Sequence, residues 1–183
     1  MSQDNTIKFE QYFTNENVAK DCINLIIKDL KNNLQEDLEN SKLHLIEPSC
    51  GEGVFVKNLK NIDLNLKITC VDIDSLYPQA IQFDFLNTNE KILNIKKSET
   101  IIFFGCPPSC LTKEFLQKCK QINQNSIVYF LLRETLLKKF IKNKVILYST
   151  ILKNYGHHVF LFQKDSYITQ SPYVLTKLTF TSR

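Results

Sequence analysis

The chain of 183 residues has no tryptophan, one methionine and four glycines, and its cysteines never form a Cys-x-x-Cys pair. Zinc modules and small disulfide-rich domains both depend on closely spaced cysteines. Here the six cysteines are scattered, and the three histidines, His44, His157 and His158, complete no ligand pattern with them. We therefore expect reduced, mostly buried thiols and no metal site.

Long hydrophobic runs and targeting signals are also absent. No apolar stretch reaches the length that crosses a bilayer, and the polar, acidic N-terminus has no signal-peptide character. We expect a soluble chain inside the cell, in the cytoplasm or the nucleus, with no membrane partner. An apolar fraction of 43%, without internal repeats or linkers, favours one globular domain over residues 1–183. This length leaves no room for a separate target-recognition domain.

The net charge of +4 is unevenly distributed along the chain. Residues 1–42 and 43–110 carry a small acidic excess, whereas residues 111–183 contain twelve Lys and Arg against three Asp and Glu. A basic cluster lies in this last third: Arg133, Lys138, Lys139, Lys142 and Lys144. Such a cluster can contact a phosphate backbone, although a lysine-rich helix face is often simply solvated. It is our candidate nucleic-acid surface.

The segment from Leu45 to Phe55 reads as a buried strand that runs into a glycine turn and then a helix. Gly51 and Gly53 permit positive φ and close backbone approach to a ligand, and Glu47 stands at the end of the strand. In α/β folds such a turn binds nucleotide-like cofactors, although a Gly-x-Gly sequence is often only a tight turn. The following strands decide between these interpretations.

The ends of the later strands carry further groups that could bind a nucleotide-like cofactor. Residues 68–71 form an apolar run that ends in Asp72, where a carboxylate can accept hydrogen bonds from both hydroxyls of a ribose. A further acid, Asp84, precedes Phe85. Residues 101–104 then enter a rigid two-proline loop, Gly105-Cys106-Pro107-Pro108-Ser109. Because ligands of open α/β sheets bind at the carboxyl ends of the strands, we expect these groups at one edge.

Helices and strands are predicted to alternate along the chain. Apolar residues at three- and four-residue spacing predict a helix over residues 16–40, with Asn15 as its cap. Further helices are expected at 53–60, 111–122 and 134–142. Strands are expected at 43–47, 67–71, just before Asp84, and at 100–104, 127–132, 145–148 and 159–162. A turn at Asn154 and Gly156 would separate the last two strands. This alternation predicts an α/β fold with a mainly parallel sheet, helices on both faces and a late antiparallel strand. The core would span about residues 43–165, followed by a loosely held Ser/Thr-rich tail over residues 168–183.

Taken in this order, the motifs resemble those of S-adenosylmethionine-dependent methyltransferases that act on the N6 amino group of adenine in DNA or RNA. Residues 10–14 (Glu-Gln-Tyr-Phe-Thr) are similar to the family's N-terminal signature, and residues 47–53 to its first glycine-rich motif. Asp72 resembles its ribose acid, the pair Asp84-Phe85 its adenine-binding pair, and residues 106–109 its catalytic loop. The resemblance covers about residues 9–165 and implies a Rossmann-like methyltransferase fold.

The resemblance also implies S-adenosylmethionine as cofactor and DNA or RNA as partner. Gln11, Tyr12 and Thr14 would close over the methionine end of the cofactor, and Asp84 with Phe85 would hold its adenine, although Phe85 can equally fill the core. The implied cofactor-binding residues are Gln11, Tyr12, Thr14, Glu47, Pro48, Gly51, Gly53, Asp72, Asp84 and Phe85. The implied catalytic residues are Cys106, Pro107, Pro108 and Ser109.

The loop of residues 106–109, the Cys-Pro-Pro-Ser loop, departs from the family pattern of Asn or Asp, Pro, Pro and an aromatic residue. Cys106 offers only a weak sulfur acceptor to the target amino group. Ser109 has no ring on which a flipped adenine could stack. Tyr129, near the end of the next strand, is a conceivable substitute for that ring. Slow or absent catalysis is therefore expected of the chain alone.

Other functions remain open at this point. The chain could be a weak or inactive methyltransferase-like subunit that binds nucleic acid or supports an active protein partner. It could also be a methyltransferase for small molecules or proteins, although that function would not need the basic last third. A third alternative gives Cys106 or Cys110 the role of a nucleophile, as in enzymes that methylate carbon-5 of cytosine, but the motif at residues 10–14 argues against that class.

Overall fold

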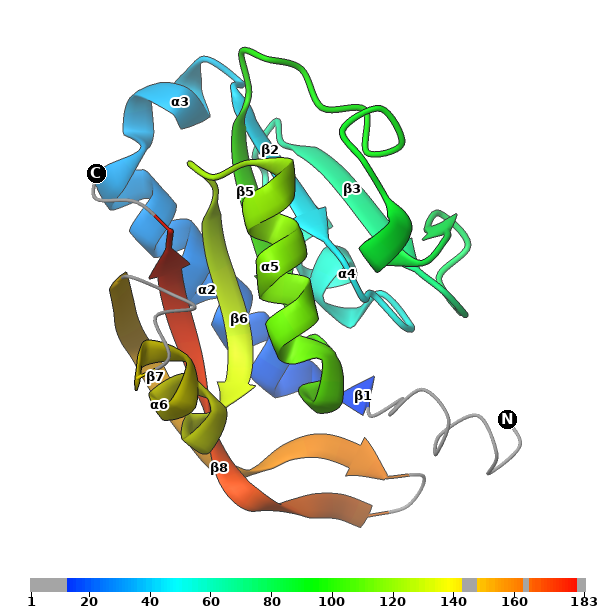
Figure 1. Ribbon diagram of the computed structural model, residues 1–183, viewed down its shortest axis with the longest axis vertical. Helices are drawn as coiled ribbons and strands as arrows, with labels where there is room; N and C mark the ends of the chain where they lie inside the picture. The colour runs from blue at the N-terminus through cyan, green and yellow to red at the C-terminus, as the bar shows by residue number, and fades with distance from the viewer. Residues whose placement is uncertain (1–12, 143–147, 163–164, 181–183) are drawn as a thin grey trace.

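A sheet of eight strands forms the centre of the computed structural model, which describes residues 13–142, 148–162 and 165–180. Its strand order is β1-β7-β8-β6-β5-β2-β3-β4 (Figure 1). β2 pairs in parallel with β3 and β5, β3 with β4, and β5 with β6, whereas β1, β7 and β8 pair in antiparallel fashion. The strands are β1 (Phe13–Thr14), β2 (Leu43–Glu47), β3 (Lys67–Asp72), β4 (Ile81–Gln82), β5 (Thr100–Gly105), β6 (Ile127–Arg133), β7 (Tyr148–Phe162) and β8 (Asp165–Thr179).

Helices cover both faces of this sheet. In Figure 1, α5 lies in front of the sheet and α2 behind it. Alternate side chains of β6 therefore enter two separate cores: Tyr129 packs with residues of α2 and α4, and Phe130 with residues of α5 and α6. The helices are α2 (Glu16–Asn33), α3 (Gln35–Glu39), α4 (Val54–Lys60), α5 (Thr112–Ile122) and α6 (Glu134–Lys142), with short 3-10 turns η1 (Phe85–Asn87) and η2 (Ser109–Leu111). The α/β fold class predicted from the sequence is confirmed.

The predicted N-terminal helix exists but is interrupted once. Asn15 caps α2 as expected, because its side-chain oxygen accepts a hydrogen bond from the backbone N–H of Asn17 at 2.9 Å. Buried apolar residues from Ala19 to Leu30 recur every three or four positions and face the sheet. At Leu34 the backbone leaves the helical region, and the short helix α3 follows in place of a continuous helix to residue 40.

The turn predicted at Asn154 and Gly156 is wrong. β7 is one long strand that passes through these residues and pairs with β8 on both sides of them. The pairing shifts register between Asn154 and Gly156, and Gly156 has a φ of +66°. Such an irregularity uses the same residue types as a turn, so the sequence signal is similar. Residues 145–147 of the predicted strand lie outside the described part of the chain.

The prediction of a loosely held tail over residues 168–183 is wrong for residues 168–179, while residues 181–183 lie outside the described part of the chain. β8 pairs with β6 from Arg133 opposite Tyr173 to Ile127 opposite Thr179, and with β7 on its other side. Val174 and Leu178 are fully buried. The serines and threonines between residues 168 and 179 therefore belong to a strand inside the sheet, where β-branched threonine is well tolerated. Pro172, which cannot donate a ladder hydrogen bond, lies where the β7–β8 register shifts.

Candidate functional site

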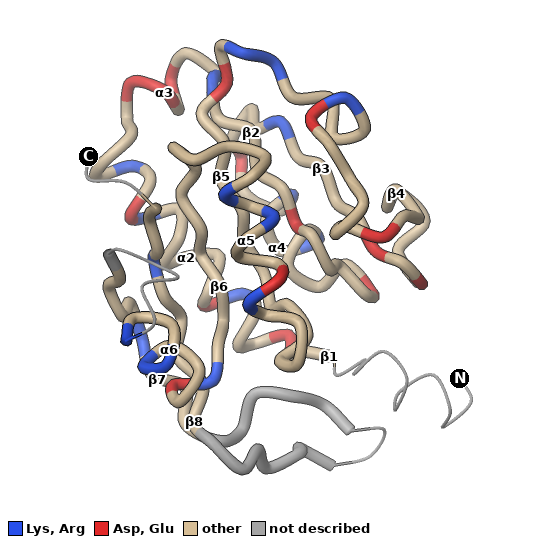
Figure 2. The backbone as a smooth tube through the Cα atoms, in the orientation of Figure 1, with Lys and Arg blue, Asp and Glu red and all other residues tan. Residues whose placement is uncertain are grey.

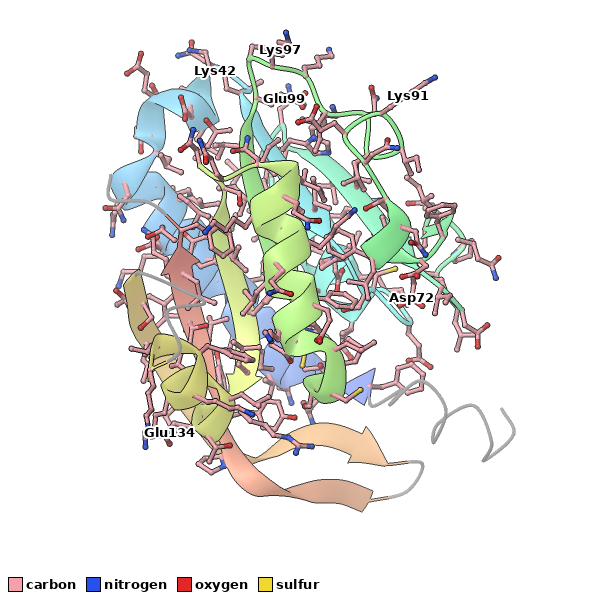
Figure 3. The ribbon with its side chains drawn as sticks, viewed as in Figure 1. Lys42, Asp72, Lys91, Lys97, Glu99 and Glu134 are labelled. Carbon is pink, nitrogen blue, oxygen red and sulfur yellow. The ribbon has the colours of Figure 1, made fainter. Side chains whose placement is uncertain are left out.

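The carboxyl ends of β2, β3 and β5 meet at one edge of the sheet, where a pocket of about 260 Å³ lies. Figure 3 shows Asp72 at this edge, at the end of β3. The pocket is lined by β1, the end of β2, the glycine turn and the start of the loop after β5, through residues that include Phe13, Thr14, Glu47, Ser49, Gly51 and Cys106. The fold thus brings together the sequence-predicted residues Thr14, Glu47, Gly51 and Cys106.

The backbone of the glycine turn leaves little room for side chains at Gly51 and Gly53. Gly51 and Gly53 have φ values of +50° and +76°, in the left-handed region that favours glycine. A Cβ at residue 53 would come within 2.6 Å of the Tyr77 ring, and one at residue 51 within 3.4 Å of the Phe13 ring. Side chains at these two positions would therefore strain the turn and narrow the space beside it.

Asp72 connects β3 to this turn. One carboxylate oxygen accepts a hydrogen bond from the Gly51 N–H at 2.8 Å, and the other accepts one from the Asp74 N–H at 2.9 Å. A carboxylate has about four acceptor sites, so these bonds leave capacity for ligand hydroxyls. Asp72 itself is not among the residues that line the pocket.

Glu47 is the most constrained acid at this edge. It is 1% exposed, and its Oε2 has no hydrogen-bond partner among the residues that the structure describes. Burial raises the pKa of the Glu47 carboxyl well above its usual range, and the negative charge of Asp72 raises it further. Gly105 makes room for it, because a Cβ at residue 105 would lie 3.2 Å from the Glu47 Cγ. A buried carboxyl beside a pocket, with one oxygen that has no partner among the described residues, is suited to meet a cationic group of a ligand.

Cys106 follows Gly105 and forms one wall of the pocket. Burial raises the pKa of its thiol to about 12, although a hydrogen bond with the Thr14 side chain acts in the opposite direction. The thiol is therefore protonated at neutral pH, and only a thiolate is a good nucleophile. The geometry thus disfavours a nucleophilic Cys106 of the kind considered from the sequence.

The far end of the Cys-Pro-Pro-Ser loop is held by β8 and by α5. Ser109 Oγ lies 2.8 Å from the hydroxyl oxygen of Tyr173, which also accepts a hydrogen bond from Arg133 Nε at 3.1 Å. The Thr112 hydroxyl at the start of α5 donates to the Pro108 carbonyl at 3.0 Å. Tyr173 was missed in the sequence, because its segment was interpreted as a loose tail. The run of Tyr173, Val174 and Leu175, which is rich in aromatic and aliphatic residues, was the available signal.

The acid–aromatic pair after β4, Asp84 and Phe85, has structural roles in the fold. Asp84 caps η1, since its Oδ1 accepts from the Leu86 N–H at 2.9 Å and its Oδ2 from the Asn87 side chain at 2.7 Å. The Phe85 ring is 2% exposed and packs against the rings of Phe103 and Phe115. Its face is therefore occupied by the core, which leaves contact with a ligand to Asp84 and the backbone. Tyr129 is likewise fully buried and cannot present a stacking surface.

The basic candidates divide between the loop and α6. Arg133 reaches the loop through Tyr173. Lys138 is 72% exposed and pairs with Glu134 one turn earlier at 2.6 Å, while Lys139 and Lys142 are exposed on the same helix. Figure 2 shows these lysines as blue segments along α6.

The remaining residues that the sequence predicted for the site either lie beside the pocket or fall outside the described residues. Pro48 and Pro107 are buried next to the residues that line the pocket. Gln11, Tyr12 and Lys144 lie outside the described residues. Within the described ranges, no group of His, Cys, Asp and Glu side chains is arranged to hold a metal ion. None of the helices that the structure describes has the length and apolar character of a membrane span.

Comparison with known proteins gives structural but not sequence relatives. No protein-family model and no curated protein matches the sequence. Among solved structures, the chain is similar to the 23S rRNA methyltransferase ErmE, with a TM-score of 0.58 and 13% identity over 84% of this chain and 69% of that one. It is also similar to PH1948 from Pyrococcus horikoshii, a candidate RNA methyltransferase, with a TM-score of 0.59 and 16% identity over 96% of this chain and 89% of that one. The chain therefore has the Rossmann-like methyltransferase fold.

Proposed function

We propose that this chain binds S-adenosylmethionine and transfers its methyl group to the N6 amino group of an adenine in a nucleic acid. One observation carries the proposal: Thr14, Glu47 and Gly51 meet Cys106 in a pocket at the carboxyl edge of the sheet. A cofactor turn and a loop of the catalytic type thus share one cavity, on a methyltransferase fold. Proteins of this architecture bind their ligands at that edge.

The residues present fit the cofactor. The Glu47 Oε2, which lacks a partner among the described residues, would accept a hydrogen bond from the amino group of the methionine part. Gly51 would let the backbone pass beside the cofactor, and Asp72 would accept from the ribose with its remaining lone pairs. An ammonium group beside Glu47 would also lower the pKa of this carboxyl and so favour its charged form.

The sulfonium of S-adenosylmethionine supplies an electrophilic methyl group with a good leaving group. What the protein must add is mainly alignment of the target nitrogen, because little acid–base help is needed. The Cys-Pro-Pro-Ser loop is well placed for this task, since Cys106 lines the pocket and Thr112 fixes the loop to α5. With a protonated thiol at Cys106, the backbone carbonyl of Pro107 becomes the main acceptor for the target amino group.

A second function is favoured by a specific feature of the loop. Ser109 has no ring, and its hydroxyl is engaged by Tyr173. A chain that binds the cofactor but captures the base poorly would act as a methyltransferase-like subunit, either binding nucleic acid or supporting an active protein partner. Among substrates, the two structural relatives favour RNA over DNA, because both are described as RNA methyltransferases.

Calorimetric titration with S-adenosylmethionine tests the cofactor site. Asp72→Ala should weaken binding about tenfold to a hundredfold, because charge-assisted hydrogen bonds to the ribose are worth about 1.5–3 kcal/mol. Asp63→Ala, in the loop before β3, is the matched control and should leave binding unchanged. Thermal unfolding of both variants separates lost binding from lost stability, since Asp72 also accepts from the Gly51 N–H.

A methyl-transfer assay tests the substrate. Radiolabel should enter an oligonucleotide that contains adenine, and not the same oligonucleotide with purine, which lacks the 6-amino group, in place of every adenine. Absence of any heat with the cofactor, together with absence of transfer, would refute both the enzyme and the cofactor-binding subunit.

A further inference from the structure

A second hollow, larger than the cofactor pocket, lies between α5 and α6. This α5–α6 groove has a volume of about 980 Å³ and begins at Ser109 and Cys110, directly beside the Cys-Pro-Pro-Ser loop. Its walls are the outer face of α5 and one face of α6, which both lie on the front of the sheet in Figure 1. The groove therefore leads away from the position proposed for the target base.

The groove face of α5 follows from the spacing of its residues. The apolar stripe that ends with Cys119 and Ile122 is buried against the sheet. Lys113, Gln117 and Lys120 are three or four residues apart on the opposite side, and all are exposed. Lys113 and Lys120 are two turns apart, or about 10.5 Å along the helix axis. They form a row that an extended ligand could follow.

The charge of the groove is positive. Lys113 and Lys120 of α5 face it together with Lys139 of α6, against a single acid, Glu114. Its lining includes the apolar side chains of Leu136 and the almost fully buried Phe140. A positive groove with a partly apolar surface is suited to an extended anionic chain whose charges are regularly spaced.

Three glutamines complete the lining: Gln117, Gln121 and Gln124. Each amide has two donors and an acceptor, so it can pair with a hydroxyl that also donates and accepts. The 2′-hydroxyl is such a group, and it distinguishes RNA from DNA. The two helices bound the groove on both sides, which suits one strand in place of a duplex.

We propose that the α5–α6 groove binds a single strand of RNA that flanks the target adenine. Lys113, Lys120 and Lys139 would contact phosphates, and the glutamines would contact 2′-hydroxyls. The assignment rests on the proposed function, because the groove matters to catalysis only if the adjacent loop receives a base. Lys113 and Lys120 were not among the nucleic-acid residues expected from the sequence.

The main test is the affinity for a labelled RNA strand, measured by fluorescence anisotropy. Lys113→Glu/Lys120→Glu should bind at least about tenfold more weakly than the wild type, and its salt slope should fall by about 0.7 for each lost phosphate contact. Lys20→Glu/Lys28→Glu is the matched control, because these exposed lysines lie on α2, behind the sheet, and change the net charge equally. The control should bind RNA as the wild type does.

The glutamines are tested by comparing RNA and DNA strands of one sequence. The wild type should prefer RNA by about fivefold for each 2′-hydroxyl hydrogen bond, and Gln117→Ala/Gln121→Ala should reduce this preference. A wild type that binds DNA or a poly-glutamate chain as tightly as RNA would contradict the proposed occupant.

Cys110 provides an independent probe of position. It is exposed at the mouth of the groove, whereas Cys22, Cys50, Cys70 and Cys119 are buried and Cys106 is half-buried. Bound RNA should slow alkylation of Cys110 by iodoacetamide, measured by mass spectrometry, in the wild type and not in Lys113→Glu/Lys120→Glu. Equal alkylation with and without saturating RNA would place the RNA elsewhere.

Calorimetry with S-adenosylmethionine separates the two proposals. Lys113 and Lys120 lie outside the cofactor pocket, so their variants should keep the wild-type affinity for the cofactor. Normal cofactor binding with RNA affinity unchanged by the lysine substitutions refutes the groove alone. Wild-type protein that binds the cofactor but no RNA also refutes the groove and leaves the cofactor site standing.

Discussion

Glu47 couples the candidate site to protein stability. Because burial raises its pKa, the folded protein keeps this proton at pH values where the unfolded chain, with a carboxyl pKa near 4.5, has released it. The contribution of the protonated carboxyl is complete below that unfolded value and is lost as pH rises through the folded pKa. The loss cannot exceed about 1.4 kcal/mol per pH unit.

We therefore predict that the free energy of unfolding of Glu47→Gln, relative to wild type, increases as pH rises above about 4.5. Urea unfolding at several pH values measures this difference. Glu52→Gln, an exposed position on the same turn, is the control and should not reproduce the trend. If the difference between Glu47→Gln and wild type is the same at every pH, Glu47 does not hold its proton in the folded protein. Saturating S-adenosylmethionine should reduce the difference, because its amino group would stabilise the carboxylate.

Under the proposed function, Cys106 and Ser109 would determine how active the loop can be. Losing one preorganised hydrogen-bonding group at a reacting centre commonly costs about 10²–10³ in rate. Wild type should thus transfer methyl groups slowly to adenine-containing RNA and DNA. Cys106→Asn should be faster, and Cys106→Asn/Ser109→Phe should also bind the target more tightly.

A radiolabelled transfer assay compares these proteins, with Cys110→Asn as the control for an amide introduced four residues further on. Fast wild-type turnover that neither substitution improves would mean that this loop works as it stands.

Among the elements, β8 joins β6 to β7 and so connects the two ends of the sheet. Leu175 is 1% exposed in the core shared with α2, whereas Ile151 on the neighbouring β7 is 50% exposed. Leu175→Ala should lower the free energy of unfolding by about 2–5 kcal/mol, and Ile151→Ala by less than about 0.5 kcal/mol. Chemical denaturation measures both. Equal, small effects would mean that β8 is not an internal strand.

The sequence predicted the strands and helices from residue 15 to residue 142 well, because each has a clear pattern of apolar residues and clear capping or turn residues at its ends. Runs such as residues 101–104 have a uniform apolar character, and Asn15 caps its helix through a local hydrogen bond. β8 was missed because its pairing with β6 is distant in sequence: Tyr173 pairs with Arg133, forty residues earlier. Local composition describes a Thr-rich segment equally well as a loop or as an inner strand, and only the sheet decides.

The residues of the candidate site also fall into two groups: those that local sequence motifs predict and those that depend on the folded sheet. Glu47, Gly51 and Cys106 come from local motifs, and the sheet brings them into one pocket. Tyr173 and the lysines of the α5–α6 groove depend on which faces the fold places together. Charge counted along the chain indicated the basic third, but it did not distinguish Lys113 and Lys120, which face the groove, from lysines elsewhere.

On the scale of the whole molecule, the charge asymmetry predicts salt-dependent association with nucleic acid. Lys138→Glu/Lys139→Glu/Lys142→Glu on α6 should weaken binding of unrelated RNA sequences by a similar factor, because phosphates are the same in all of them. Salt titrations with two oligonucleotides measure this effect. Lys20→Glu/Lys28→Glu/Lys31→Glu on α2 carries the same change in charge and is the comparison. An affinity that does not depend on salt in the wild type would exclude phosphate contacts as its source.

The position of β8 between β6 and β7 also limits when the pocket can be completed during folding. β1, which supplies Phe13 and Thr14 to the pocket, pairs only with β7 among the described strands, and β7 reaches the rest of the sheet only through β8. β2 to β6 can therefore pair before β8 is in place, but the wall of the pocket that β1 supplies forms only after β8 has joined the sheet. Under the proposed function, a chain that ends before β8 would lack this wall and should bind the cofactor more weakly than the full chain.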